Sequence, residues 1–229
     1  MCYLEEDRTG WGGFMPTTFL LARHGETEWN RDGRWQGQSD VALSALGLAQ
    51  ARALGQRLAP EPVAAIYSSD LIRARATADA IARALARPAP VHLDRRLREV
   101  DVGRIAGLTR REVAEAFPEF WAALKDHPVD TRFPGGETFR ELEARVLEAV
   151  QEIAARHPDE TVVVVTHGGV IRSVVAWVLG LDPERRGRLL LDNCGLTVIE
   201  WSERPRLRTL NETGFLAAVP DGEVLRRGG

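Results

Sequence analysis

Two histidines in this 229-residue sequence come at the ends of apolar runs, and each is followed directly by glycine. His24 follows the run TTFLLAR at residues 17–23, and His167 follows the run TVVVV at 161–165 after Thr166. An imidazole serves as a nucleophile, as a general acid or base, or as a metal ligand. Glycine lets the chain approach a ligand closely. One histidine beside an apolar strand is usually structural, but two in the same setting indicate a site.

Two more polar residues follow predicted strands. Arg73 lies one turn into the helix that follows VAAIYSS, three residues after Asp70, and can point back toward the strand end. Glu99 lies in the charged segment RRLREVD, where a surface carboxylate is the simpler interpretation on local evidence. Arginine forks match the geometry of phosphate oxygens. Together these residue types favour a phosphate site with a histidine nucleophile.

A metal site is the alternative use of the same residues. Zinc needs a third protein ligand beside two histidines, and Glu99 could supply it. Arg23 adjoins His24, however, and a fixed cation beside a metal ion is electrostatically unfavourable. We therefore predict no metal at this site.

The elements that must position these residues alternate between strands and helices, which indicates an α/β fold. Predicted strands cover 17–23, 63–69, 91–93 and 161–165, with an antiparallel pair at 195–201 and 206–210. Predicted helices cover 44–58, 70–86 with Asp70 as N-cap, 109 to Phe117-Pro118, 138–157 and 168–180. Ligands in open α/β sheets bind beyond the carboxyl ends of strands. The singled-out residues should therefore meet at one edge of the sheet.

The composition restricts the class of protein. Hydrophobic residues make up 44% of the chain, and the net charge of −3 argues against non-specific nucleic-acid binding. No apolar run approaches the roughly 20 residues that span a membrane. Two cysteines without zinc-site spacing favour a reduced, cytoplasmic protein. We expect a single domain at 16–220, a disordered N-terminal tail at 1–15 and a C-terminal tail at 221–229.

Five sequence blocks occur in one order along nearly the whole chain, from Thr18 to Asn211. They are RHGET, YSSDLIRARATA, LREVDVG, GGET and THGG. In this pattern the chain resembles the histidine phosphatase superfamily, also called the phosphoglycerate-mutase-like family, and its phosphatase branch in particular. The resemblance implies a three-layer sandwich with a mostly parallel central sheet and helices on both faces.

The resemblance also implies a role for each matching residue. His24 would become phosphorylated, and Glu99 would be the general acid and then the general base. Phosphoryl oxygens would be held by Arg23, Arg73, His167, Asn30 and Gln36. Gly168 opens a helix whose free N–H groups favour an anion. Neighbouring guanidinium charge should keep His24 neutral, as a nucleophile must be. No cofactor is implied, the partner is a small-molecule phosphate ester, and a homodimer is left open.

Three functions remain open at this point. A phosphatase that hydrolyses phosphomonoesters through phosphohistidine is favoured over a cofactor-dependent phosphoglycerate mutase, because the segment from Glu99 to Gly135 is short and mutases carry a longer, basic one. This segment contains Phe117, Phe120, Trp121 and Phe133, which we expect to form an apolar rim. A non-catalytic module that binds phospho-ligands is the third alternative. Family members usually carry an acidic-aromatic sequence where this chain has Gly103-Arg104-Ile105-Ala106-Gly107, which weakens any assignment of a relative's substrate to this chain.

Overall fold

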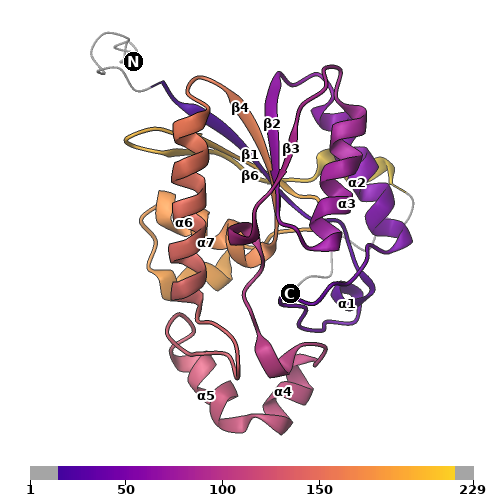
Figure 1. The fold of residues 1–229 in the computed structure, drawn as a ribbon. Coiled ribbons are helices and arrows are strands. Elements are labelled where there is room, and N and C mark those ends of the chain that lie inside the picture. Colours follow the sequence, from indigo (N-terminus) through magenta and orange to yellow (C-terminus); the bar gives the residue numbers. More distant parts are fainter. Residues whose placement is uncertain (1–14, 220–229) are drawn as a thin grey trace, which may run out of the picture.

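The computed structural model describes residues 15–219, which form one six-stranded sheet in the order β3-β2-β4-β1-β5-β6 (Figure 1). The parallel strands are β1 (Thr17–Arg23), β2 (Val63–Ser68), β3 (Val91–Leu93) and β4 (Thr161–Thr166). The antiparallel pair is β5 (Leu196–Trp201) and β6 (Arg206–Glu212). The predicted mostly parallel sheet is confirmed. The predicted tails at 1–15 and 221–229 lie almost wholly outside the described residues.

The central strands are buried on both faces, which explains their continuous apolar sequences. Side chains of β1 alternate between two core clusters, with Phe19 and Leu21 in one and Leu20 and Ala22 in the other. The valines of β4 divide in the same way. Both faces of the sheet therefore need helices over them.

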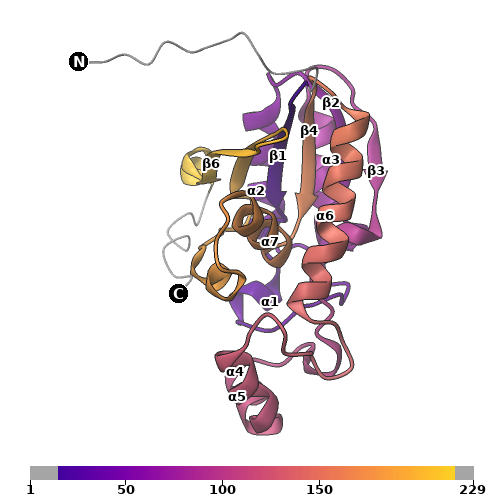
Figure 2. The same ribbon diagram turned by 90° about the vertical axis from the view of Figure 1, so that its left-hand side faces the viewer.

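Helices cover the sheet on both sides (Figure 1). One face carries α2 (Ala45–Leu58) and α3 (Ile72–Ala84), and the other carries α6 (Phe139–Arg156) and α7 (Gly168–Val178). The three-layer prediction is confirmed. The short helices α4 (Arg110–Ala116) and α5 (Pro118–Asp126) project beyond the sheet, as both views show (Figures 1 and 2). No helix in the described part combines the length and the apolar character needed to cross a membrane.

The predicted helix starts were right at three of four N-caps. Ser44 caps α2 by accepting from Gly47 N, and Thr109 and Thr138 each form a capping box with a glutamate three residues later. Asp70 as the N-cap of α3 was wrong: Leu71 is the N-cap and gives no side-chain hydrogen bond. Asp70 instead accepts two hydrogen bonds of 2.6 Å from Arg98, because a bidentate guanidinium is a stronger partner than a backbone N–H.

Two α-helices were not predicted from the sequence. The four-residue α1 (Glu28–Arg31) follows the Arg-His-Gly turn, with Thr27 as its N-cap. The helix expected to stop at Phe117-Pro118 does stop there, but Pro118 also begins α5. Proline suits the first position of a helix, where its missing N–H would have had no partner.

Candidate active site

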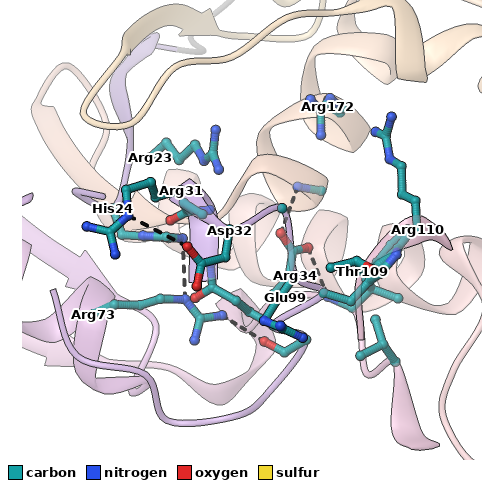
Figure 3. A pocket seen from close by; sticks show the side chains of 18 of the residues that line it. Arg23, His24, Arg31, Asp32, Arg34, Arg73, Glu99, Thr109, Arg110 and Arg172 are labelled. Atoms are coloured by element: carbon teal, nitrogen blue, oxygen red, sulfur yellow. Dashed lines mark hydrogen bonds and ion pairs between the residues drawn. The ribbon is translucent and has the colours of Figure 1, made fainter. Parts of the chain in front are cut away.

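A cavity of about 620 Å³ opens at the carboxyl ends of β1, β2 and β4, where the sequence predicted a shared site. Its wall contains six of the predicted site residues. They are Arg23, His24, Asn30, Gln36, Arg73 and Glu99. Figure 3 shows His24 beside Arg73, with Glu99 facing the same space. Residues from opposite ends of the chain are thus brought to one chamber.

Backbone oxygens hold both the main chain and the ring of His24. The main-chain N–H of His24 donates to Thr166 O at 2.9 Å, which continues the pairing of β1 with β4. The ring atom Nδ1 lies 2.7 Å from Gly25 O. A carbonyl can only accept, so Nδ1 carries the proton and Nε2 bears the lone pair. That lone pair faces Arg73, whose Nε donates to it at 3.3 Å.

The charge state of His24 suits a nucleophile. Burial lowers the pKa of His24 well below the ordinary value, and the charges of Arg73 and Arg23 lower it further. The predicted direction is confirmed, although burial is the larger cause and the sequence argument gave only the arginines. The imidazole is therefore neutral at neutral pH.

The two arginines beside His24 are fixed by main-chain oxygens. Arg73 is fully buried, and its Nη atoms donate to Ser39 O and Gly37 O at 2.7 Å each. Arg23 donates to Leu191 O at 2.6 Å, while its buried Nε has no partner. Burial lowers the pKa of each guanidinium to about 10, so both stay charged at neutral pH. An unpartnered buried donor next to a neutral imidazole fits an anion.

His167 lies behind His24. The ring centroids of His24 and His167 are 5.2 Å apart, and the ring of His167 is fully buried. Its Nε2 lies 2.9 Å from Ser69 Oγ, while its Nδ1 is buried without a partner. Burial, and then the charge of Arg73, lower the pKa of His167 well below its ordinary value. His167 is the one predicted catalytic residue absent from the cavity wall.

Glu99 is clamped at the start of α7. Its carboxylate accepts from Val100 N at 2.9 Å and from Gly169 N at 3.1 Å. A Cβ atom on Gly169 would lie 2.2 Å from Glu99 Oε1, so any larger residue there would displace the carboxylate. The main chain of Glu99 is held as well, because Arg145 donates to Glu99 O at 2.9 Å and to Arg98 O at 2.8 Å. These hydrogen bonds fix the position of Glu99 in the wall of the cavity.

Of the three predicted binding residues, Asn30 and Gln36 lie on the cavity wall and Gly168 does not. Asn30 Oδ1 accepts from Thr27 N at 3.1 Å in the capping box of α1, which leaves its amide nitrogen for a ligand. Gln36 is buried on the wall, and its Oε1 has no partner. Gly169 lines the cavity, whereas Gly168 lies behind it, where an added Cβ would be 3.3 Å from Arg172 Nη1. The binding role of Gly168 stays a prediction.

Two expectations about the surroundings were wrong. The four aromatic residues Phe117, Phe120, Trp121 and Phe133 do not line the cavity. Phe133 is fully buried and the others pack against the same core, because these rings gain more by burial together than by facing a charged chamber. Gly25 does not face the ligand space either. A Cβ on it would lie 2.4 Å from Gly47 O, so it permits close packing of α2 on this turn.

Sequence reasoning missed three residues at the site. Arg110 and Arg172 are on the wall. Asn193 donates through Nδ2 to His24 O at 2.9 Å and to Asn30 Oδ1 at 3.3 Å. Arg172 could have been found from its place one turn into the helix after His167, since that face points toward the cavity. Nothing local distinguishes Asn193, which folding brings close from a loop near the C-terminus.

Within residues 15–219 no group of three or more His, Cys, Asp or Glu side chains could hold a metal ion. Cys194 is buried and unpaired. Burial raises the pKa of its thiol strongly.

Comparison with known proteins identifies the family. Residues 19–213 match the family model described as histidine phosphatase superfamily (branch 1). The chain belongs to this superfamily. It is 39% identical to the metal-independent phosphoserine phosphatase of Arabidopsis thaliana, over 91% of this chain and 89% of the relative. It is 36% identical to a probable phosphoglycerate mutase of Citrobacter koseri, over 80% and 84% of the two chains.

Solved structures of this histidine phosphatase family have the same fold. The YhfR protein of Bacillus stearothermophilus superposes with a TM-score of 0.82 at 33% identity, covering 87% of this chain and 99% of the other. A mycobacterial glucosyl-3-phosphoglycerate phosphatase superposes with a TM-score of 0.77 at 32% identity, covering 86% and 100%. The resemblance inferred from the five sequence blocks is confirmed.

Proposed function

We propose that this protein is a metal-independent phosphatase that hydrolyses phosphomonoesters through a phosphohistidine on His24. The lone pair of His24 Nε2, beside two fixed guanidinium groups, is the observation that carries the proposal. The buried Arg23 Nε without a partner supports an anion in the same place. Relatives named as phosphatases support the reaction class.

In the first half of the reaction, Nε2 attacks phosphorus and the bond from phosphorus to the ester oxygen breaks. Protonated Glu99 gives its proton to that oxygen, and the alcohol leaves. Nδ1 keeps its proton and its hydrogen bond to Gly25 O, which stabilises the positive ring of the phosphohistidine. Arg23 and Arg73 stabilise the charge on the equatorial oxygens, where preorganised donors contribute most.

In the second half, the Glu99 carboxylate takes a proton from water as the water oxygen attacks phosphorus. The N–P bond breaks, inorganic phosphate forms, and the lone pair returns to Nε2. Glu99 is protonated again for the next cycle. Two covalent steps thereby replace one direct attack by water.

The mutase alternative differs in what accepts the phosphoryl group. It is supported by the relative named as a probable phosphoglycerate mutase. The aromatic rim that we expected to favour a phosphatase is absent, so our preference rests on the short segment after Glu99 and on the phosphatase relatives. Incubation with 3-phosphoglycerate, with and without 2,3-bisphosphoglycerate, separates the two. Isomer formed much faster than phosphate would favour the mutase.

The phosphoenzyme itself provides the direct test. Mixing with a ³²P-labelled phosphomonoester and quenching should give labelled protein whose label is lost in acid and kept in base. His24→Ala should abolish both the label and turnover, and EDTA should leave the rate of the unaltered protein unchanged. Full turnover by His24→Ala, or a rate that EDTA removes and metal restores, would contradict the proposal.

A comparison of leaving groups tests Glu99. Glu99→Gln should slow hydrolysis of an alkyl phosphate by about 10²–10⁴-fold, because a positioned acid typically contributes that much. Hydrolysis of p-nitrophenyl phosphate should slow far less, since nitrophenolate leaves without a proton. Equal slowing with both substrates would remove Glu99 from the acid role.

A further inference from the structure

A loop at residues 191–195 lies against the end of β1, although it comes late in the chain. Leu191 O accepts a hydrogen bond of 2.6 Å from Arg23 Nη1. Cys194 N donates to Arg23 O at 3.1 Å and to His24 O at 3.3 Å. The loop therefore contacts both the residue proposed to attack phosphorus and the neighbouring cation.

The side chain of Asn193 in this loop bridges two residues of the site. Its Nδ2 donates to His24 O at 2.9 Å and to Asn30 Oδ1 at 3.3 Å. A carbonyl oxygen only accepts, so the nitrogen of the Asn193 amide must be the atom that faces His24. An amide nitrogen carries two protons, which is enough for both acceptors. Asn193 thus connects the main chain of the nucleophile with the side chain of Asn30.

This bridge helps to fix which end of the Asn30 amide faces the cavity. Asn30 Oδ1 also accepts from Thr27 N and from Thr27 Oγ1, each at 3.1 Å. Turning the amide over would bring its own N–H groups against these donors and that of Asn193, and would present an oxygen lone pair to an anion in the cavity. Asn30 lines the cavity, so the observed orientation leaves its Nδ2 to donate there.

The position of Asn30 relative to His24 depends on the same bridge. Asn30 lies on α1, a helix of four residues without a buried side chain, and so short a helix is not stable by itself. The Thr27 cap connects α1 only to the residue that precedes it. Asn193, in contrast, connects Asn30 across the fold to the main chain of His24.

Asn193 is supported by its own neighbours in the fold. Asn211 Oδ1 accepts from Asp192 N at 2.8 Å, and Asn211 Nδ2 donates to Asp192 Oδ2 at 2.8 Å. These two bonds fix the loop directly before Asn193. A side chain that positions another group needs such a rigid support.

We propose that Asn193 is a positioning residue of the phosphoryl site, which directs Asn30 Nδ2 toward the transferred phosphoryl group and holds it at a fixed distance from His24. This inference deepens the proposed function and rests on it, because it places the phosphoryl group beside His24. Asn193 does not line the cavity, so its effect is exerted through Asn30.

The affinity for inorganic phosphate measures this effect without turnover. Asn193→Leu keeps the branched shape of the side chain and removes its donor, and we expect the Kd for phosphate to rise by about tenfold. Asn30→Ala should raise the Kd by a similar or larger factor. In the Asn30→Ala background, Asn193→Leu should change the Kd by less than about twofold, because the group that Asn193 positions is gone. Calorimetric titration of the unaltered protein and the three variants completes this double-mutant cycle.

The matched control is Leu190→Ala, because Leu190 is exposed and directly precedes the loop. It should leave the Kd for phosphate unchanged. An unchanged Kd in Asn193→Leu would overturn the proposal. Equal losses from Asn193→Leu with and without the Asn30 side chain would also overturn it, since they would mean that Asn193 supports the loop in general.

A second variant covers the case in which Asn193→Leu does not fold. Asn193→Asp keeps the size and polarity of the side chain but places an acceptor opposite Asn30 Oδ1. In the unaltered protein, phosphate should shift the side-chain amide resonances of Asn30, which are assigned by their absence from the spectrum of Asn30→Ala. In Asn193→Asp this shift should be lost. A shift equal to that of the unaltered protein, or no shift in either protein, would overturn the proposal.

These outcomes differ from those that decide the proposed function. A ³²P-labelled phosphoenzyme and turnover, together with additive effects of Asn193→Leu and Asn30→Ala, would overturn the role of Asn193 and leave the phosphatase standing. Coupled effects on phosphate affinity, with no labelled protein and no hydrolysis of any ester, would support the role of Asn193 and contradict the phosphatase.

Discussion

At the scale of single residues, the proposed chemistry depends on keeping His24 uncharged beside two cations. The ring is buried, and its Nδ1 proton is committed to Gly25 O. Protonation of Nε2 would place a third positive charge next to Arg73 and Arg23 in a buried site. The same features that prepare the nucleophile therefore make the fold sensitive to acid.

The free energy of unfolding should therefore fall as the pH is lowered. Burial and neighbouring arginines lower the pKa of His24 and of His167, so the unfolded chain binds protons that the folded chain does not. The stabilisation is complete above about pH 6.5, the ordinary histidine pKa, and is lost as the pH falls below it. Each histidine should contribute a slope of up to about 1.4 kcal/mol per pH unit in that range.

Urea denaturation between about pH 4.5 and 7.5 measures this slope in the unaltered protein and in His24→Gln. The variant should show a smaller acid slope, because one of the two titrating histidines is gone. Depressed carboxyl pKa values, such as that of Asp70 beside Arg98, act at lower pH and should not change. Equal slopes in the two proteins would mean that His24 is not held neutral.

At the scale of elements, the site is assembled where strand ends meet helix starts. β1 delivers Arg23 and His24, while α3 delivers Arg73. The start of α7 fixes Glu99, because Gly169 leaves room for the carboxylate and donates a hydrogen bond to it. The position of the predicted acid thus depends on a glycine that lies 70 residues later in the sequence.

Replacing that glycine tests the contact. Gly169→Ala should displace Glu99 and lower kcat for alkyl phosphates by about 10²-fold or more, with a much smaller effect on p-nitrophenyl phosphate. In a Glu99→Ala background the same change should have little effect, since the carboxylate that the methyl group would meet is gone. The double-mutant cycle measures this coupling. Additive effects would show that Gly169 acts independently of Glu99.

At the scale of the whole molecule, the charge of the cavity is opposite in sign to the net charge of the chain. The chain carries −3 overall, yet its cavity is strongly cationic. Exposed ion pairs such as Arg140 with Asp130 take up acidic side chains elsewhere. Folding therefore brings seven arginines to the wall of one cavity, and the mutual repulsion of the buried ones opposes the folded state.

An anion in the chamber should relieve that repulsion and raise the melting temperature. Inorganic phosphate at about 100 times its dissociation constant should stabilise the fold by about 2.7 kcal/mol. For a domain of this size the shift is about 5–10 °C. Thermal denaturation with sodium phosphate and with sodium chloride at equal ionic strength measures the effect. An identical shift with the two salts, or with Arg73→Gln in place of the unaltered protein, would contradict anion binding at His24.

The sequence by itself determined the α/β class, the order of the principal elements and the set Arg23, His24, Arg73, Glu99 and His167. These features could be predicted because buried strands and helix caps have recognisable local sequences. The five sequence blocks also occur in the order typical of the family. The edge of the sheet at which these residues meet also follows from the sequence, since parallel strands bring their carboxyl ends together.

Only the tertiary structure decided what surrounds that set. The partner of Asp70, the burial of Phe133 and the place of His167 behind His24 depend on contacts between distant segments. Arg110 of α4 and Arg172 of α7 likewise reach the wall of one cavity only through folding. Local patterns identify the groups proposed to be catalytic, whereas side-chain contacts between distant segments set the polarity and shape of the space where a substrate would bind.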